Sequence, residues 1–350
     1  MPIVPEKTAS SVIMRLMAAG ADYAELYAEE ARSKSIRLID KQIERATSGV
    51  DCGAGVRAIY GINQVYAYTT DMSEAALMRA AEAVAEAGQT NAASPTLMLS
   101  PVSAESPHVF LVDPEDVEAR ERVELLLAVD RAARAHSEQV NQVDAGIGET
   151  AKDVLVANSA GAWVEDKRSY SRLSIVAIAQ KGAEKERAYR SPGALAGYEY
   201  IRSQDAEGLA REAAECAARM VNAGYAPAAE IPVVVGNGFG GVIFHEACGH
   251  ALETTSVAKR ASVFGDKLGR QVANECLAAV DDGTMAGLWG SSVFDDEGSL
   301  TQRTTLIEKG VLKAFMADRL GAIRTGQPLS GSGRRESYRY PPTSRMRNTY

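Results

Sequence analysis

Three side chains that could hold a metal ion and use it in catalysis lie close together in the sequence: His245, Glu246 and His250. The chain has only four histidines, and two of them fall in this short stretch. Where two histidines bind zinc from one helix, the glutamate that follows the first activates the metal-bound water for hydrolysis. The residue types therefore predict that His245 and His250 bind Zn²⁺ and that Glu246 acts as the general base.

The spacing of the two histidines departs from the usual four residues. His245 and His250 are five positions apart. On an ideal helix five residues turn by roughly 500°, which points the second imidazole about 140° away from the first. A single-turn π-bulge would absorb the extra residue, and Gly249 supplies the backbone freedom for it, so we expect a local irregularity. The alternative is two ordinary histidines, one buried and one exposed.

A catalytic zinc normally has three protein ligands and one open position, and the motif offers only two. Cys248 lies between the histidines, where its side chain would point away from a shared ion, and Cys276 follows further along the chain. Free cysteine usually packs as a small hydrophobic residue. We expect that role for both, as for Cys52 and Cys216, so the motif itself predicts no third ligand.

Glycines separate the histidine motif from an apolar run, residues 231–235, that we expect to be a strand. Gly236, Gly238 and Gly241 fit the GxGxxG fingerprint of dinucleotide binding, which also needs a second strand ending in an acidic residue about 20 positions later. Residues 254–266 are polar and contain no such strand, so that interpretation is disfavoured. The favoured role is a sharp turn from strand to helix that leaves room for a substrate backbone. The glycines expected beside the substrate are Gly238, Gly240 and Gly241.

Four segments carry a family resemblance. They are residues 244–250, 294–298, 333–338 and 345–350. Together they resemble the TldD branch of the TldD/PmbA (TldE) metallopeptidases, over nearly the whole chain. The resemblance implies that His245 and His250 are zinc ligands and that Glu246 is the general base. Because the PmbA-like branch lacks the histidine motif, the resemblance places this chain on the catalytic side.

The resemblance also implies properties of the whole protein. Family members take a third zinc ligand from a cysteine near the C-terminus, beyond the segment that ends at Tyr350, so we expect this chain to be a fragment or a natural truncation. The implied activity is hydrolysis of unfolded or extended peptides that bind as an added strand. The implied assembly is a homodimer or a heterodimer with a PmbA/TldE-like subunit. The alternative function is a non-catalytic interaction subunit, inactive because the third ligand is missing.

Two further groups of charged residues could serve the site. A basic and aromatic group near the C-terminus either holds a peptide carboxylate or backbone, or lies in an exposed loop. The acidic run 295–297 could hold a second metal, but its position just before Gly298 favours a turn. The substrate-binding candidates of the basic group are Arg334, Arg335 and Tyr338, next to Arg339 and Tyr340.

Composition limits the class of protein. A net charge of −8 disfavours nucleic-acid binding, which needs a basic face to displace phosphate counterions. Four scattered cysteines argue for a reducing compartment rather than a disulfide framework. The N-terminus lacks an apolar signal core and no apolar run is long enough to span a bilayer. We therefore expect a cytoplasmic protein with no membrane partner.

Hydrophobic periodicity predicts an α+β fold that begins with helix and antiparallel-sheet units. The family resemblance implies that a mostly β catalytic domain follows, which carries the histidine helix and is incomplete at its C-terminus. The expected domains are an α/β unit at 1–90, a linker at 91–112, a second α/β unit at 113–224 and a metallopeptidase domain at 225–350. Helices are expected at 8–19, at 73–87, from the Asp113 cap to about His136, and at 205–223. Short strands are expected at 23–27, 35–39, 55–59, 64–68, 142–147, 152–158, 162–166 and 173–179.

Overall fold

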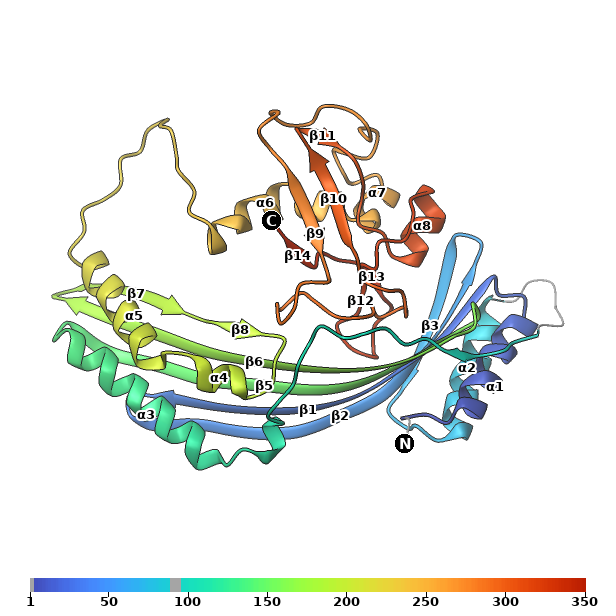
Figure 1. The fold of residues 1–350 in the computed structure, drawn as a ribbon, viewed down its shortest axis with the longest axis horizontal. Coiled ribbons are helices and arrows are strands. Elements are labelled where there is room, and N and C mark those ends of the chain that lie inside the picture. The colour runs from blue at the N-terminus through green and yellow to red at the C-terminus, as the bar shows by residue number, and fades with distance from the viewer. Residues whose placement is uncertain (1–2, 89–95) are drawn as a thin grey trace.

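A long antiparallel sheet forms the base of the molecule in the computed structural model, which describes residues 3–88 and 96–350. Four long strands run along it, and the order in the sheet is β3-β2-β1-β5-β6-β4, with β7 and β8 also paired to β6 (Figure 1). The α+β fold is therefore confirmed. The strands are β1 (Tyr23–Ile39), β2 (Gln42–Tyr60), β3 (Asn63–Thr69), β4 (Ser100–Pro101), β5 (Val140–Asn158), β6 (Ala162–Lys181), β7 (Glu184–Arg190) and β8 (Gly193–Ala194).

The prediction of short strands is confirmed at 64–68, which is β3, but was wrong elsewhere, because the other segments belong to long strands. Segments 23–27 and 35–39 are the two ends of β1, a single strand of 17 residues, and the pairs expected at 142–158 and 162–179 likewise merge into β5 and β6. The polar stretch inside β1 resembles a turn only in isolation. In the sheet its charges have partners on the next strand, since Arg32 Nη2 lies 2.8 Å from Asp153 Oδ2 on β5. Such cross-strand pairs stabilise a sheet without any apolar side chain.

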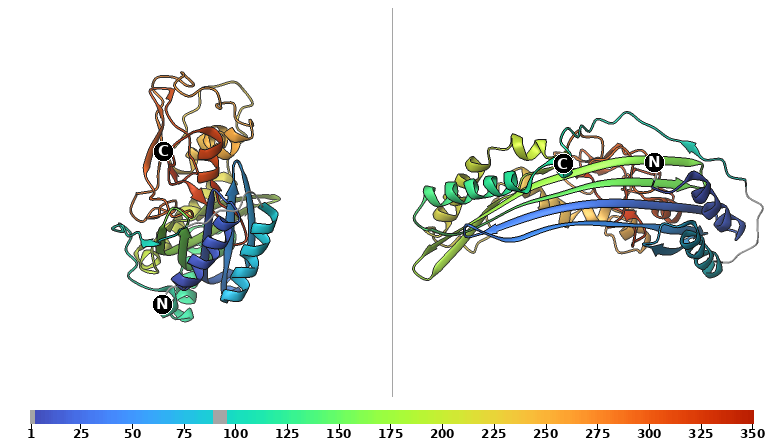
Figure 2. Two further views of the ribbon diagram at one scale, coloured as in Figure 1. Left: turned by 90° about the vertical axis from the view of Figure 1, so that its right-hand side faces the viewer. Right: turned by 90° about the horizontal axis from the view of Figure 1, so that it is seen from below.

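One face of the sheet is covered by helices at both of its ends (Figure 2). Side chains alternate between the two faces of a strand. On β1, Ala24, Leu26 and Ala28 pack with helices α1 (Glu6–Ala18) and α2 (Glu74–Gly88). Further along the same face, Ile36 and Leu38 pack with the core that includes α3 (Ala119–His136) and α5 (Ala206–Met220). A single strand thus joins both helical layers.

The four helices lie within a few residues of their predicted ranges, with one difference at the start of α3. Asp113 was expected to cap this helix, but its carboxylate accepts a hydrogen bond of 2.9 Å from the Glu115 amide and caps a separate 3₁₀ turn, η1 (Pro114–Asp116). The α-helix begins only at Ala119, after Glu118 in extended conformation. A short helix, α4 (Glu199–Ser203), precedes α5, whose N-terminus is capped by the Asp205 carboxylate.

The C-terminal part of the chain lies over the concave face of the sheet (Figure 1). There Tyr27 and Val156 of the sheet pack with Phe294 and Tyr338. This part holds a four-stranded sheet of order β11-β10-β9-β14 and a β12–β13 pair. Its elements are η2 (Gly238–Gly241), α6 (Val242–Ala247), η3 (Gly249–Leu252), α7 (Thr254–Ala258), β9 (Ala279–Asp282), β10 (Arg303–Glu308), β11 (Val311–Leu312), α8 (Arg319–Thr325), β12 (Gly333–Arg334), β13 (Thr343–Ser344) and β14 (Asn348–Thr349).

The strand expected at 231–235 does not form. This run is extended but belongs to no sheet, and its apolar side chains face solvent, with Val234 98% exposed. An apolar run becomes a strand only when a neighbouring strand accepts and donates its backbone hydrogen bonds. Among the described residues none does so for this segment. Sequence periodicity indicates the extended conformation and cannot reveal the absence of a partner.

The proposed domain boundaries remain a prediction, although β1 pairs with β5 and so places units 1–90 and 113–224 in one sheet. Part of the expected linker, residues 91–95, lies outside the described residues. The remainder runs extended beside β6, where Ser100 and Pro101 form the parallel strand β4. Within the described ranges, no helix combines the length and apolar character needed to cross a membrane.

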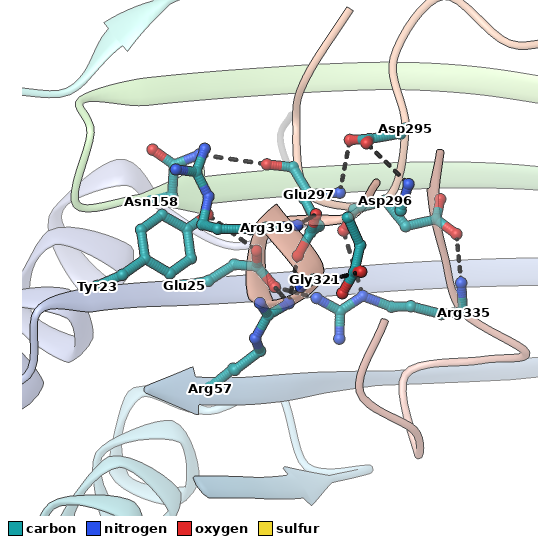
Figure 3. A network of polar contacts seen from close by, with 12 residues as sticks. Tyr23, Glu25, Arg57, Asn158, Asp295, Asp296, Glu297, Arg319, Gly321 and Arg335 are labelled. Carbon is teal, nitrogen blue, oxygen red and sulfur yellow. Dashed lines mark hydrogen bonds and ion pairs between the residues drawn. The ribbon is translucent and has the colours of Figure 1, made fainter. Parts of the chain in front are cut away.

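An acidic turn anchors the C-terminal part to the sheet (Figure 3). The turn predicted at 295–297 is confirmed, with Gly298 at φ +78°, but its carboxylates are buried and paired. Glu297 Oε1 lies 2.6 Å from Arg57 Nη1 on β2, and Asp296 Oδ1 lies 2.6 Å from Arg168 Nη1 on β6. Burial would raise the pKa of Asp296, but the Arg168 guanidinium holds it well below its usual range. These ion pairs fix the position of the C-terminal part on the sheet.

Candidate metal centre

The histidine motif is split between two short helices. Helix α6 ends at Ala247, Cys248 adopts φ −128° and ψ −46°, and the 3₁₀ helix η3 begins at Gly249. The predicted irregularity is therefore confirmed, but its form is a helix break and not a π-bulge. The break turns His250 back toward His245, because the residue between the helices absorbs the rotation that a continuous helix would impose.

Gly249 serves packing rather than backbone distortion. A Cβ atom at this position would lie 2.3 Å from the Met346 sulfur, far inside van der Waals contact. The distorted backbone belongs to its neighbour Cys248. Gly249 thus allows the motif to approach the C-terminal segment that carries Met346.

The three candidate residues come together in space. His245 Nε2 and His250 Nε2 are 3.0 Å apart, and their rings are nearly perpendicular at 87°. Glu246 Oε1 is 3.9 Å from His245 Nε2. One candidate ligand atom from each of the three residues falls within 4.8 Å of the others, and the described residues contain no other such group of histidine, cysteine and acidic side chains. Cys248 and Cys276 are outside this group.

The distance between the imidazole nitrogens fits a shared zinc ion. Two ligands at about 2.0–2.1 Å from a tetrahedral zinc would be about 3.3 Å apart, close to the observed 3.0 Å. Burial, followed by the charge of His250, lowers the pKa of His245, which favours the neutral imidazole that binds metal. The side chains of His245 and Glu246 are 42% and 67% exposed, so the centre opens to solvent.

Glu253 is a functional candidate that sequence reasoning missed. Its buried carboxylate Oε1 lies 3.2 Å from His250 Nδ1. When Nδ1–H donates to this carboxylate, the lone pair of Nε2 points toward His245. Histidine ligands in metal sites commonly use their second nitrogen in this way. The signal in the sequence was an acidic residue three positions after His250, a spacing that places both on one helical face.

The substrate-binding candidates near the motif lie in the turn η2. Gly238 has φ +75°, a conformation that favours glycine. A Cβ at Gly240 would lie 2.7 Å from Val235 Cγ1, so this glycine lets the extended segment fold against the turn. Neither a preceding strand nor a βαβ unit is present here, and the dinucleotide-binding interpretation loses its structural basis.

Of the three C-terminal candidates, only Arg334 remains available to a ligand. Tyr338 is fully buried, and its hydroxyl donates to Asp51 Oδ1 at 3.0 Å. Arg335 pairs with Glu25 on β1, and both side chains are fully buried. These two residues join the C-terminal part to the sheet, so the exposed-loop alternative is wrong for them. The guanidinium of Arg334 has a single described partner, the Met346 carbonyl at 3.2 Å from Nη1.

Comparison with protein families identifies the class. Three family models match successive parts of the chain, all described as PmbA/TldA metallopeptidase domains. Domain 1 matches residues 24–88, the central domain residues 112–221 and the C-terminal domain residues 228–350. The C-terminal domain model includes the histidine motif.

Similar curated proteins place the chain in one branch of this family. A metalloprotease TldD homolog of Haemophilus influenzae is 35% identical over 340 residues, covering 94% of this chain and 70% of the relative. A metalloprotease of Methanothermobacter thermautotrophicus is 30% identical and is covered to 71%. A zinc metalloprotease TldD homolog of Saccharolobus solfataricus is 37% identical over 124 residues, which is 35% of this chain and 28% of the relative. This chain belongs to the TldD family of metalloproteases.

Solved structures share the fold. A putative modulator of DNA gyrase from Thermotoga maritima superimposes with a TM-score of 0.78 at 19% identity, covering 96% of this chain and 76% of that one. TldE from Thermococcus kodakarensis gives a TM-score of 0.75 at 19% identity, covering 97% and 77%. At this identity the likeness establishes the architecture alone.

Proposed function

We propose that this protein is a zinc metallopeptidase in which His245 and His250 hold the metal and Glu246 is the general base. The observation that carries the proposal is the meeting of the two imidazole nitrogens at 3.0 Å, with the Glu246 carboxylate beside them. A regular helix would separate these nitrogens. The break at Cys248 brings them into a geometry that suits one ion.

Each residue has a distinct part in the proposed reaction. Zinc, when bound, would supply a Lewis acid that activates water and polarises a carbonyl. Glu246 accepts the proton of the attacking water and passes it to the departing amine. Glu253 holds His250 in the tautomer whose Nε2 is free to bind metal. The Glu246 side chain is 67% exposed, so water can reach its carboxylate.

The proposed substrates are unfolded or extended peptides. A centre that opens to solvent accepts a chain passing over it, whereas a deep cavity would select a particular side chain. Backbone hydrogen bonds then dominate recognition, as when a peptide is added as a strand. The proposed setting is the cytoplasm, and the proposed assembly is a homodimer or a heterodimer with a TldE-like subunit, for which the shared fold with TldE gives support.

A third protein ligand would complete the proposed centre. The family resemblance assigns this ligand to a cysteine beyond Tyr350, and the chain spans about 70% of the length of the Haemophilus influenzae relative. The second candidate function is that of a non-catalytic subunit of a TldD/TldE-type complex, for which the shared fold with TldE gives support. Metal content separates the two functions.

Elemental analysis of zinc, combined with hydrolysis of unfolded casein, tests the proposal. This chain would be compared with a version extended to the length of the relatives. We expect one zinc per active chain, lost in His245→Ala and His250→Ala, and kept in Glu246→Gln, which should lose hydrolysis. Full activity in His250→Ala would refute the assignment. Absence of zinc and hydrolysis from both chain lengths, with dimerisation retained, would support the subunit function.

A further inference from the structure

A basic cavity of about 470 Å³ lies between the sheet and the C-terminal part. Its floor is a row of directly paired residues on β5 and β6, Gly148 opposite Arg172, Thr150 opposite Tyr170, and Lys152 opposite Arg168. These positions alternate along each strand and therefore share one face of the sheet. Seven lysine and arginine residues line the cavity, against three aspartate and glutamate residues.

Four of these seven cations are neutralised inside the protein. The other three, Arg172, Arg334 and Arg347, have no carboxylate within 4.0 Å among the described residues. A cluster of guanidinium groups that make no direct contact with a carboxylate attracts an anion from solution. The neutralised pairs are Lys34 with Glu115, Lys152 with Glu29, Arg168 with Asp296, and Arg335 with Glu25.

Two of the three unpaired guanidinium groups also have free donors. Arg172 donates only Nε, to Ser191 Oγ at 2.8 Å, and Arg334 donates only Nη1, to the Met346 carbonyl. An arginine has five N–H donors arranged as a planar fork. Most of the donors of these two residues therefore have no acceptor among the described residues.

Arg347 supplies a fixed positive charge at the same cavity. Its Nε and Nη2 donate to the Gly331 carbonyl at 3.1 and 2.9 Å, and its Nη1 donates to Ser292 Oγ at 3.0 Å. Burial, and then the nearby Arg334 guanidinium, lower the pKa of Arg347 to about 10. The nearby Asp295 and Asp296 carboxylates act in the opposite direction. The cation therefore remains charged near neutral pH, although none of the described residues places a carboxylate within 4.0 Å of it.

The cavity has room for a ligand next to these donors. A Cβ at Gly148, opposite Arg172, would meet no atom within 4 Å. Trp289 forms an apolar side of the cavity. Its ring centroid lies 5.2 Å from the ring centroid of Tyr170 and 5.5 Å from the guanidinium carbon of Arg172. Planar guanidinium groups bind carboxylates through two parallel hydrogen bonds. The acidic residues in the wall, including Glu336, disfavour a large polyanion.

We propose that this cavity binds a carboxylate group of a peptide, with Arg172 and Arg334 as the donors and Arg347 as the supporting charge. The peptide class rests on the proposed peptidase function, but the anion site does not require the metal centre. The carboxylate comes either from the C-terminus of the peptide chain or from an acidic side chain. In either case the cavity would hold one point of an extended peptide against the sheet.

Isothermal titration calorimetry on metal-free protein tests this inference without hydrolysis. The probes are N-acetylated pentaalanine as the free acid, the same peptide as the C-terminal amide, and that amide with a central glutamate. We expect Arg334→Gln and Arg172→Gln each to weaken binding of the acidic peptides at least tenfold, because each variant loses charge-assisted hydrogen bonds to the carboxylate. Arg120→Gln, an exposed arginine on α3, is the matched control and should bind like the unchanged protein.

The outcomes distinguish the two possible sources of the carboxylate, and they distinguish failure of this proposal from failure of the proposed peptidase function. Binding of the free acid alone would assign the site to a chain end, and binding of the glutamate peptide would assign it to an acidic side chain; either supports the proposal. Equal binding of the plain amide, no effect of both arginine variants, or binding of inorganic phosphate without either acidic peptide would overturn it. Because zinc is absent from the assay, a protein that fails as a peptidase can still pass this test.

Discussion

Replacing Arg57 by methionine should strongly destabilise the protein. Arg57 Nη1 lies 2.6 Å from Glu297 Oε1 and 3.8 Å from Glu25 Oε1, and all three side chains are fully buried. Removing the cation leaves Glu297 with the Arg319 amide, at 2.7 Å, as its remaining described donor. Breaking a buried ion pair by deleting one partner costs about 3–5 kcal/mol. We expect a loss of this order in the free energy of unfolding.

The double variant Arg57→Met/Glu297→Gln tests the ion pair more directly than the single variant does. Glu25 keeps Arg335 as its partner, so the charge left without a cation in Arg57→Met is mainly that of Glu297. Adding Glu297→Gln removes this charge, and the double variant should therefore recover part of the stability lost in the single one. Urea unfolding followed by circular dichroism would measure both. Arg120→Met, which removes an exposed ion pair with Glu124, should leave stability unchanged.

One result would refute this reasoning. If Arg57→Met and the double variant unfold at the same urea concentration, the buried pair is not energetically coupled. The C-terminal part would then be held on the sheet by apolar contacts, such as those of Tyr27 with Phe294 and Tyr338. The cost of leaving a carboxylate unpaired in the interior would have been overstated.

Three further predictions concern the metal centre and its surroundings. Glu253→Gln should weaken zinc binding about 10–100-fold, measured by competition with a chelator; unchanged affinity would remove Glu253 from the site. Gly249→Ala should cost about 1–3 kcal/mol, because the new methyl group meets the Met346 sulfur, and a melting curve equal to that of the unchanged protein would contradict this. Burial, and then the charge of Glu297, raise the pKa of Asp318 to about 6. The folded state therefore binds a proton at Asp318 more tightly than the unfolded state does. As a result, the contribution of Asp318 to the free energy of unfolding falls as the pH rises from about 4 to about 6. Asp318→Asn keeps a side-chain oxygen to cap α8 and should flatten that pH dependence in urea unfolding; an unchanged slope would assign the dependence to other groups.

The features that the sequence predicted are those encoded locally. Helices α2 and α5 lie within a few residues of the ranges expected from the sequence, 73–87 and 205–223. The candidate metal centre was equally visible, because His245, Glu246 and His250 lie within one short segment. Even the local irregularity followed from the number of residues between the histidines, although its form, a helix break and not the expected π-bulge, depends on packing that the spacing does not encode.

The features that the sequence could not predict depend on partners far along the chain. The polar interior of β1 becomes a strand because residues on β5 pair with it, more than a hundred positions away. Arg335 and Tyr338 were expected either to bind substrate or to lie in an exposed loop, yet their partners Glu25 and Asp51 are on the first two strands. Local composition assigns such residues to the surface, whereas a buried ion pair becomes visible only when both charges are placed.

The metal centre is built from one short segment of the chain, whereas the basic cavity is built from distant segments. Their functions can therefore be disturbed separately. The metal-binding candidates come from one segment, α6 to η3, while the unpaired guanidinium groups come from β6, β12 and the segment near the C-terminus. Asp296 lies in the cavity wall and also pairs with Arg168, so the acidic turn that anchors the C-terminal part helps to shape the cavity. A change in that anchor should therefore disturb peptide binding before it disturbs metal binding, because only the cavity requires both parts of the molecule to be correctly placed.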